Sequence, residues 1–439
     1  MTSERAPGGY RGAFVAYNAA LAATSPMLLG WYGWRVLGSG KSREGWLERL
    51  GFPAGSQKGI VPRSNIWMHA VSVGEVTAAA PVVREYQQLP EPYGVEMSTI
   101  TSTGRQMADR LLPEVPKLFL PVDLLPPVRA VVRRVRPLCL ALCEKELWPN
   151  LLNEAKRCGA KVALINGVVS DRTVERAQRV GLIYQWTLSN IDRFLMQTQE
   201  DAEKIVRLGA DESRVEVSGN TKFDEADEPL TTKEALDVAE SMGLDPLAPV
   251  FVAGSTNPGE DEVVLAAFRA AKSRTPALRL VIAPRQIERA GEIQELASGY
   301  GYSSVKRSEV QSRHEADVVV LNTFGELAKA YAMAVVAFVG GTFINKGGHN
   351  ILQPLAQGVP VTFGPYDQNI RGIAAKAVGA GVAYRAETPE ALAHAVRDLA
   401  AGHDQLQYRE RALKLIQENR GASRKCAETL HELARLAAS

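Results

Sequence analysis

Short apolar runs alternate with longer amphipathic stretches along most of the chain. The runs are rich in β-branched residues and about four to eight residues long, which is typical of buried strands. They lie at 66–73, 94–101, 117–123, 138–144, 161–167, 193–199, 215–220, 249–256, 278–284, 302–307, 317–323, 334–341, 358–365 and 381–386. The stretches between them carry apolar residues at helical spacing. Because strands alternate with helices, the pattern predicts parallel sheets built from βαβ units.

The alternation pauses between Lys222 and Pro249, where the chain is acidic and polar. We interpret this stretch as an interdomain linker with a connecting helix. The predicted fold is α/β, with two doubly wound Rossmann-like domains facing each other across a cleft that holds one substrate on each side. Ligands of such sheets bind beyond the carboxyl ends of the strands. The predicted boundaries are 1–36 for an N-terminal segment, 37–228 for the first domain and 229–439 for the second, which ends in a helical tail over 389–438.

The N-terminal segment has no charged residue from Gly12 to Trp34. This stretch is long enough to span a bilayer, but Pro26 and polar residues interrupt it, and its aromatic end is typical of a membrane interface. The basic residues that follow favour the cytoplasmic face of a membrane. They are Arg35, Lys41, Arg43, Arg49, Lys58 and Arg63, against Glu44 and Glu48. We predict a helix that anchors in, or rests on, the inner membrane; a buried first helix of the domain is the alternative.

Composition narrows the function classes. The chain has 439 residues, of which 46% are hydrophobic and 23% charged, which excludes a disordered chain and a polytopic membrane protein. Lys plus Arg is 51 and Asp plus Glu is 49, so no general basic field exists to hold nucleic acid. Four cysteines without a CxxC pair argue against a disulfide scaffold and a zinc site, and favour a reducing cytosol.

Ionisable residues follow several predicted strands of the first domain directly. Glu75 opens a helix after a strand, where the helix dipole favours an ionised carboxylate, so it is a candidate base. Glu144 and Glu146 follow a buried strand and can point the same way, with Lys145 between them to neutralise one. Lys222, at the domain junction, can stabilise a phosphate or a developing anion. Each also has a purely structural interpretation: a helix-end carboxylate, a surface turn and a solvated lysine.

In the second domain, glycine and hydroxyl residues follow the strands. Gly254 and Ser255 precede a helix, and backbone N–H groups at such a place bind anions. Arg285, after another strand, can pair with a phosphate. The chain lacks both GxGxxG at these strands and the Walker lysine, so neither a dinucleotide nor a P-loop site is indicated.

Two glycine clusters, at 323–326 and 340–348, predict close approach of the backbone to a ligand. Asn350 and Gln353 are predicted to share one face of a helix that opens at His349 or Asn350, where they can bind ribose hydroxyls. Each cluster alone could reflect tight packing. Together in one domain they favour a nucleotide site.

The ordered motifs resemble those of the Kdo (3-deoxy-D-manno-octulosonic acid) transferases of lipid A biosynthesis, which are inverting GT-B glycosyltransferases. The motifs are SVGE, ExELWPN, SGNxKFD, GST, PR, FGEL, FVGGTFxxxGGHN and GP, within about Gly30 to Glu418. The resemblance implies that Glu75 is the general base and that Glu144 and Lys222 stabilise the transition state. It also implies that CMP binds through Pro284, Arg285, Phe324, Gly325, Glu326, Asn350, Ile351, Leu352 and Gln353. Together with Gly254, Ser255, Gly348 and His349 of the glycine segments, these residues make up the predicted donor (CMP) site.

The resemblance implies transfer of Kdo from CMP-Kdo to a lipid A precursor, lipid IVA, in lipopolysaccharide core biosynthesis. The expected partners are this donor, the lipid acceptor and the cytoplasmic surface of the inner membrane, reached by a single N-terminal anchor or a monotopic contact. No metal is expected, because no Asp-x-Asp motif is visible. No cofactor and no nucleic acid partner are expected either. Another GT-B enzyme, either a UDP-sugar transferase or an epimerase, and a non-catalytic lipid-binding relative are the alternatives.

The chain departs from the family pattern mainly on the donor side. Gln353 stands where the family has glutamate, and Gln286 and Asn257 stand where it has histidine. Val168 takes the place of an arginine in the family's NAR motif. The expected base and both stabilisers are unchanged.

Overall fold

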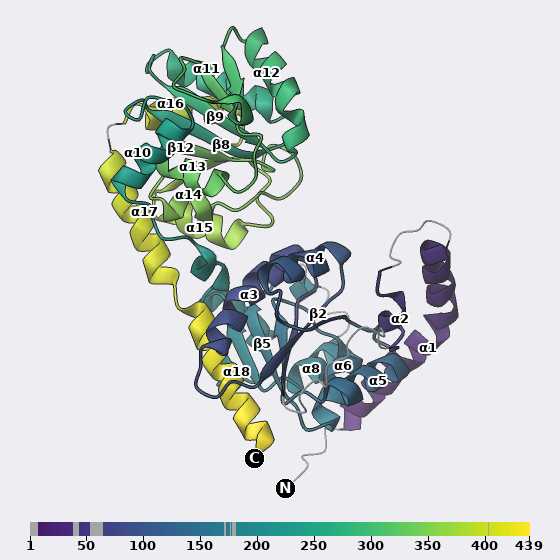
Figure 1. Ribbon diagram of the computed structural model, residues 1–439. Helices are drawn as coiled ribbons and strands as arrows, with labels where there is room; N and C mark the ends of the chain where they lie inside the picture. The colour runs from purple at the N-terminus through teal and green to yellow at the C-terminus, as the bar shows by residue number, and fades with distance from the viewer. Residues whose placement is uncertain are drawn as a thin grey trace. The chain divides into compact units, whose positions relative to one another are not determined.

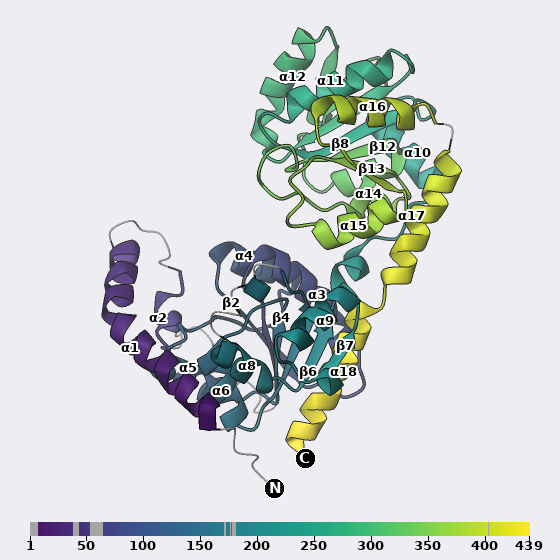
Figure 2. The same cartoon turned by 180° about the vertical axis from the view of Figure 1, so that it is seen from behind.

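Two compact units make up the chain in this computed structural model, which describes residues 8–37, 44–52, 65–170, 173–175, 177, 181–402 and 404–439. Unit 1 comprises Met1–Glu225 and Asn419–Ser439, and unit 2 comprises Ala226–Glu418. Each unit contains one parallel sheet with helices on both faces (Figures 1 and 2). The predicted doubly wound α/β fold is therefore confirmed in both units.

The sheet of unit 1 has the strand order β3-β2-β1-β4-β5-β6-β7. Its strands are β1 (Asn65–His69), β2 (Gly94–Thr99), β3 (Lys117–Phe119), β4 (Cys139–Cys143), β5 (Lys161–Gly167), β6 (Arg193–Met196) and β7 (Val215–Val217). The helices are α1 (Gly8–Leu37), α2 (Trp46–Arg49), α3 (Val73–Gln87), α4 (Ser102–Leu111), α5 (Leu125–Val135), α6 (Pro149–Arg157), α8 (Gly181–Ser189), α9 (Gln199–Arg207), η1 (Glu212–Arg214), η2 (Thr221–Glu225) and α18 (Ala422–Ala438). The strand order reverses between β1 and β4, where ligands of such sheets bind.

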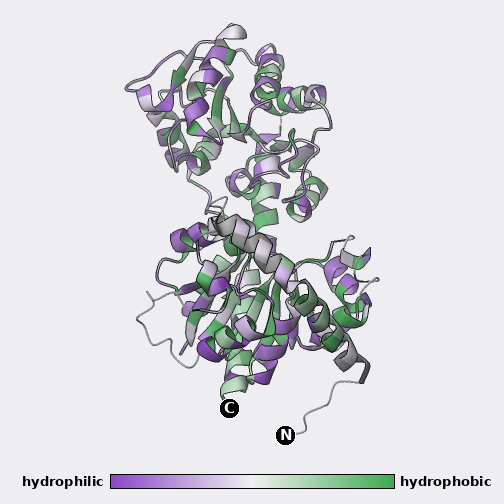
Figure 3. Cartoon of the chain, turned by 90° about the vertical axis from the view of Figure 1, so that its right-hand side faces the viewer, coloured by the Kyte–Doolittle hydropathy of each residue, from purple (hydrophilic) through white to green (hydrophobic). Residues whose placement is uncertain are grey.

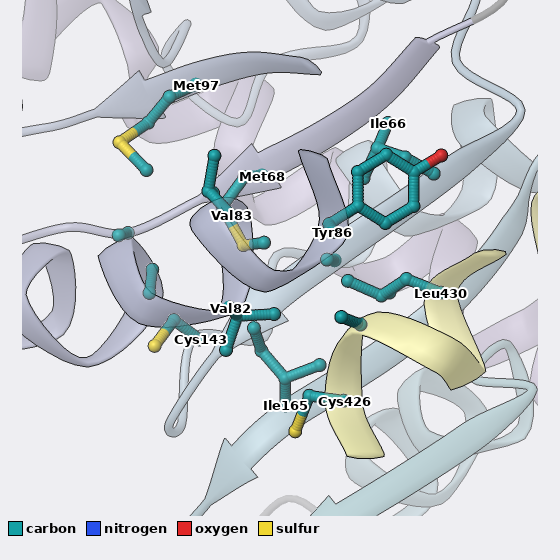
Figure 4. Close-up of a cluster of buried hydrophobic side chains, with 14 of the residues drawn as sticks. Ile66, Met68, Val82, Val83, Tyr86, Met97, Cys143, Ile165, Cys426 and Leu430 are labelled. Atoms are coloured by element: carbon teal, nitrogen blue, oxygen red, sulfur yellow. The ribbon is translucent and has the colours of Figure 1, made fainter. Parts of the chain in front are cut away.

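The side chains of β1 alternate between the two faces of this sheet. Ile66 and Met68 are buried against α3 and α18, as Figure 4 shows. Trp67 points to the opposite face, where α5, α6 and α9 cover the sheet. Both faces are apolar because a parallel sheet buried on both sides needs near-continuous hydrophobic strands. Figure 3 shows this concentration of hydrophobic residues along the strands.

The last helix is where the fold differs from the predicted boundaries, which assign the whole tail to the second domain. In the structure α18 belongs to unit 1. Cys426 and Leu430 lie in the core beside α3 (Figure 4). The Asp224 carboxylate accepts hydrogen bonds from the backbone N–H groups of Gly421 (2.6 Å) and Ser423 (2.7 Å), which fixes the start of the helix. The amphipathic pattern predicts a buried face but does not identify the surface that buries it.

The sheet of unit 2 has the order β10-β11-β9-β8-β12-β13-β14, again with every pair parallel. Its strands are β8 (Val250–Thr256), β9 (Arg279–Pro284), β10 (Ser304–Lys306), β11 (Val318–Val320), β12 (Ala334–Val339), β13 (Val361–Phe363) and β14 (Ala383–Arg385). The helices are α10 (Thr232–Ser241), α11 (Asp261–Lys272), η3 (Ile287–Arg289), α12 (Ala290–Gly299), η4 (Arg307–Glu309), α13 (Leu327–Ala330), η5 (Tyr331–Met333), α14 (Leu352–Ala356), α15 (Arg371–Gly379), α16 (Pro389–Ala400) and α17 (Gln405–Asn419). Helices α11, α12 and α16 cover one face, while α10, α13 and η5 pack on the other.

Helix α1 carries the uncharged N-terminal stretch and passes through Pro26 without a break. The ring of Phe14 lies 4.6 Å from that of Trp186 on α8, a helix that the sequence pattern did not predict. The Tyr17 hydroxyl donates to Asp123 at 2.8 Å, so part of α1 packs on the rest of unit 1. Within the described ranges, no helix is long and apolar enough to cross a membrane. Membrane association stays a prediction, and Lys41, Arg43, Lys58 and Arg63 lie outside the described residues.

Candidate active site

Glu75 lies in the first turn of α3, directly after β1, and only 5% of it is exposed. Its carboxylate accepts a hydrogen bond from the backbone N–H of Val71 at 2.8 Å. Burial raises the pKa of Glu75 to about 7, helped by repulsion from Glu146 and Glu144, although the Val71 N–H lowers it. Burial therefore opposes the ionised form that the helix dipole is expected to favour, because loss of solvent outweighs the favourable Val71 N–H.

Glu144 follows β4, on the other side of the point where the strand order reverses. Its backbone adopts a left-handed conformation with φ 62, held by a hydrogen bond from its N–H to Ile165 (3.0 Å). The Lys222 ammonium donates to its carboxylate at 2.8 Å. The predicted neutralising lysine was Lys145, whereas the structure gives this ion pair to Lys222. A left-handed non-glycine residue at a strand end is a form of strain that concentrates at functional sites.

A network of amide side chains that the sequence analysis did not single out holds Lys222 in place. Asn220 accepts from the backbone N–H of Lys222 at 3.0 Å and donates to Gln197 at 2.9 Å. Gln197 donates to the carbonyl of Asn166 at 3.1 Å, and Asn166 accepts from the Thr221 N–H at 3.1 Å. The available signal was the position of these amides just past the ends of apolar strands. Asn166 begins the variant NAR motif and is fully buried.

Thr221 also ties this loop to the helix that carries Glu75. Its hydroxyl donates to the carbonyl of Ala78 on α3 at 2.7 Å. Glu75, Glu144 and Lys222 thus come from three separate segments but belong to one connected framework within unit 1. The structure brings together the three predicted catalytic residues at the carboxyl edge of the sheet.

The predicted donor residues lie at the carboxyl edge of the sheet in unit 2. A side chain on Gly254 would meet the Tyr331 hydroxyl at 1.9 Å, so glycine is required here by packing. Ser255 has a left-handed backbone with φ 57. A side chain on Gly340 would lie 2.4 Å from the Ser255 carbonyl. These contacts bring the ends of β8 and β12 close together, where the strand order reverses in this sheet.

Pro284 ends β9 next to this point, and Arg285 follows it. The backbone N–H of Arg285 donates to the Thr256 carbonyl at 2.8 Å, and its side chain is exposed. Among the described residues, Arg285 has no ion-pair partner, so its guanidinium is available to an anion. Gln286, one of the departures from the family, is exposed as well.

In the 323–326 cluster, which is predicted to let the backbone approach a ligand, the Glu326 side chain is already engaged. The Arg307 guanidinium pairs with the Glu326 carboxylate at 2.9 Å, and the Thr323 hydroxyl donates to the same group. Gly325 has φ 83, and Phe324 is 83% exposed. Phe324 and Gly325 are therefore accessible, whereas the Glu326 carboxylate already has partners.

The predicted shared helical face of Asn350 and Gln353 is wrong. Helix α14 begins at Leu352, and Asn350 lies before it, where its side chain accepts the Leu352 N–H at 2.9 Å. The left-handed glycines Gly347 and Gly348 keep the preceding loop out of helical conformation. Gln353 lies in the first turn and is partly exposed. Asn350 thus forms a turn just before the helix, and the two residues lie in a loop and at a helix start.

Comparison with known proteins sets the family. The family model for 3-deoxy-D-manno-octulosonic-acid transferase (kdotransferase) matches residues 44–225. The 3-deoxy-D-manno-octulosonic acid transferase of Haemophilus influenzae is 30% identical over 423 residues, covering 94% of this chain and 97% of the relative. The chain belongs to the 3-deoxy-D-manno-octulosonic acid transferase family.

Two further proteins are similar to this chain. A bifunctional glycosyltransferase/methyltransferase of Fusobacterium nucleatum is 32% identical over 340 residues, which is 76% of this chain; the chain spans about half, 52%, of that relative. A crystal structure of UDP-GlcNAc 2-epimerase from Neisseria meningitidis bound to UDP-GlcNAc has a TM-score of 0.54. The epimerase is 13% identical to this chain. The likeness covers 85% of this chain and 100% of the epimerase chain, and it shows a shared fold alone.

In the part of the chain that the structure describes, no cluster of three or more His, Cys, Asp or Glu side chains is arranged to hold a metal ion. The predicted absence of a metal in this family member stays a prediction.

Proposed function

We propose that this protein is an inverting glycosyltransferase that transfers Kdo from CMP-Kdo to a lipid A precursor such as lipid IVA. The observation that carries the proposal is the buried Glu75, whose pKa is about 7, in one framework with the Glu144–Lys222 ion pair. A carboxyl group with a pKa near the working pH suits general base catalysis. Family membership supplies the choice of donor and acceptor.

In the proposed reaction, Glu75 takes the proton from an acceptor hydroxyl. The hydroxyl oxygen forms a bond to the anomeric carbon of Kdo, and the bond from that carbon to the phosphate oxygen breaks with its electron pair. CMP leaves as an anion, so no protein acid is needed for the leaving group. Glu144 and Lys222 stabilise the charges that develop, because their own charges are held in fixed positions before the reaction.

We place CMP at the carboxyl edge of the sheet in unit 2. Its phosphate meets the backbone at Gly254 and Ser255 and the exposed guanidinium of Arg285, a pairing that is strong when bidentate. The nucleoside lies against Phe324 and Gly325 and the segment 348–353, where Gln353 hydrogen-bonds a ribose hydroxyl. Support comes from the exposure of Arg285 and Phe324 and from the tight glycine contacts at this edge.

We also propose that the protein works on the cytoplasmic side of the inner membrane. Exposed apolar side chains on α1 and α2 support this, because apolar surface that is exposed to water gains free energy when it is buried in a lipid interface. They are Val15, Met27, Trp34, Trp46 and Leu47. A membrane-resting enzyme can reach an amphipathic acceptor without a spanning helix.

The test is mass spectrometry of lipid IVA incubated with the protein and CMP-Kdo, beside a Glu75→Gln preparation. The expected product is heavier by one or more Kdo groups and is absent with the variant. UDP and CMP are compared as competitors. Inhibition by UDP but not CMP, or no product from CMP-Kdo, would contradict the proposal and favour another nucleotide sugar.

A further inference from the structure

Glu260 is a fully buried carboxylate that is surrounded by N–H donors. It precedes α11, but its side chain turns to the loop after β12. There it accepts from the backbone N–H groups of Gly341 (2.8 Å), Thr342 (2.9 Å) and Phe343 (2.9 Å). The N–H and side-chain amide of Asn257 add two more hydrogen bonds at 3.1 Å. Few groups other than an anion can satisfy so many converging donors.

Successive backbone N–H groups that converge on one point form an anion-binding nest. In α/β nucleotide sites, a nest beside the point where the strand order reverses commonly receives a phosphate. The nest over 341–343 has this location, because β12 and β8 are the adjacent strands there. Here the chain's own carboxylate fills the nest, so a ligand phosphate finds no free donor in it.

We infer that Glu260 is a positioning residue of the donor site: it fills the nest after β12, fixes the glycine loop 340–348, and thereby directs the donor phosphate to Ser255 and Arg285. This rests on the proposed function for the identity of the donor. The loop leads directly into His349 and Gln353, so its shape sets where these groups meet a nucleotide.

Asn257 extends this arrangement to the far side of the loop. Besides its two bonds to Glu260, its side-chain oxygen accepts from the Lys346 ammonium at 2.6 Å. The Asn369 side-chain amide donates a hydrogen bond to the Lys346 carbonyl at 2.9 Å. Asn257 stands where the family has histidine, and in this chain it serves as the link between Glu260 and the loop cation. The departure therefore has a defined structural role here.

The first test replaces Glu260 with glutamine, which keeps the size but places an NH₂ group against N–H donors. Glu262→Gln is the matched control, because Glu262 lies two residues away on the exposed side of α11. We expect amide hydrogen exchange over 341–343 to be about tenfold faster or more in Glu260→Gln, since charge-assisted bonds are lost. We expect CMP affinity, measured by calorimetry, to fall about tenfold while the acceptor KM stays unchanged. The control changes neither.

The second test is chemical rescue. Glu260→Ala leaves the nest vacant, so acetate should bind there, raise the unfolding temperature of this variant and restore part of its CMP affinity. Acetate should have no such effect on the parent or on Glu262→Ala. If Glu260→Ala does not fold, Glu260→Gln still decides the matter through exchange and CMP affinity together.

The outcomes separate the two proposals. Unchanged exchange and unchanged CMP affinity in Glu260→Gln would overturn the positioning role and leave the proposed function standing. A parent protein that binds no CMP would overturn the proposed function, and with it the donor part of this inference. Faster exchange with unaltered CMP affinity would reduce Glu260 to a structural residue and so overturn the inference as well.

Discussion

The candidate sites of the two units are built in different ways. In unit 1 the key groups are side chains with defined partners. The buried Glu75 carboxylate accepts a hydrogen bond from the Val71 N–H, and Lys222 forms an ion pair with Glu144. In unit 2 the site is largely backbone, shaped by left-handed glycines and by the filled nest at 341–343. The departures from the family fall mainly in unit 2. A site defined by backbone shape tolerates exchange of side chains, whereas proton transfer needs one particular side chain.

The most severe test of this difference between the two units is Glu75→Gln. The variant keeps the size and hydrogen-bonding capacity of the side chain but removes the base, so we expect turnover to fall about a hundredfold or more. CMP affinity should stay within about twofold of the parent, because the nucleotide is assigned to unit 2. Steady-state kinetics and calorimetry measure the two, with the exposed Glu91→Gln as control. Parent-like turnover would remove Glu75 from the base role.

The pH profile tests the same group without a substitution. A base with a pKa of about 7 must be deprotonated to act, so kcat/KM should rise about tenfold per pH unit below 7 and level off above it. Stability should move the opposite way. Because the folded pKa lies above the unfolded value, the folded state holds a proton that the unfolded state releases, and stability relative to Glu75→Gln falls as pH rises from about 4.5 to about 7. A flat difference between the two proteins would contradict the raised pKa.

The Glu144–Lys222 pair sharpens the contrast by a double-mutant cycle. Lys222→Met should lower kcat about tenfold or more, since a fixed charge that stabilises the transition state is lost. Glu144→Gln should do likewise, and the double variant should lose less than the two single effects combined because they share one interaction. Fully additive effects on kcat would show that the two residues act independently.

Gln353 is the mildest test and concerns unit 2. If it hydrogen-bonds the ribose, Gln353→Glu should tighten CMP binding by up to ~1 kcal/mol, because a charged acceptor makes the stronger bond. Gln353→Ala should weaken binding by a comparable or larger amount. Calorimetry with CMP decides. Unaltered binding in both variants would show that this side chain does not touch the nucleotide.

Much of the fold and of the candidate sites could be predicted from the sequence. Buried parallel strands leave apolar, β-branched runs, and residues directly after them reach one edge of the sheet, so the neighbourhoods of Glu75 and Arg285 were predictable. The raised pKa of Glu75 was not predictable, because burial depends on how distant segments cover the side chain. The ion pair of Glu144 with Lys222 was missed for the same reason: it joins residues 78 positions apart.

The conformation of the loops was the other feature that the sequence could not predict. The sequence shows the glycines at 340–348 but not that Gly347 and Gly348 take left-handed conformations, which delays the helix start to Leu352. Glu260 was visible only as a helix-start acid, since its five donors come from two segments. Periodicity predicts regular elements well because it reports burial, and loops lack such a signal.

Helix α18 belongs to unit 1 although it follows unit 2 in the sequence, and this has a consequence for the order of folding during synthesis. Unit 2 is inserted within unit 1, so Leu430 and Leu433 reach their core only after the whole of unit 2 has been translated. At ribosomal speed this leaves the face of α3 that they cover open for on the order of ten to forty seconds. An apolar face exposed for that long attracts chaperones and other nascent chains. The nascent chain therefore depends on long-range contacts that form last, which also slows refolding in vitro.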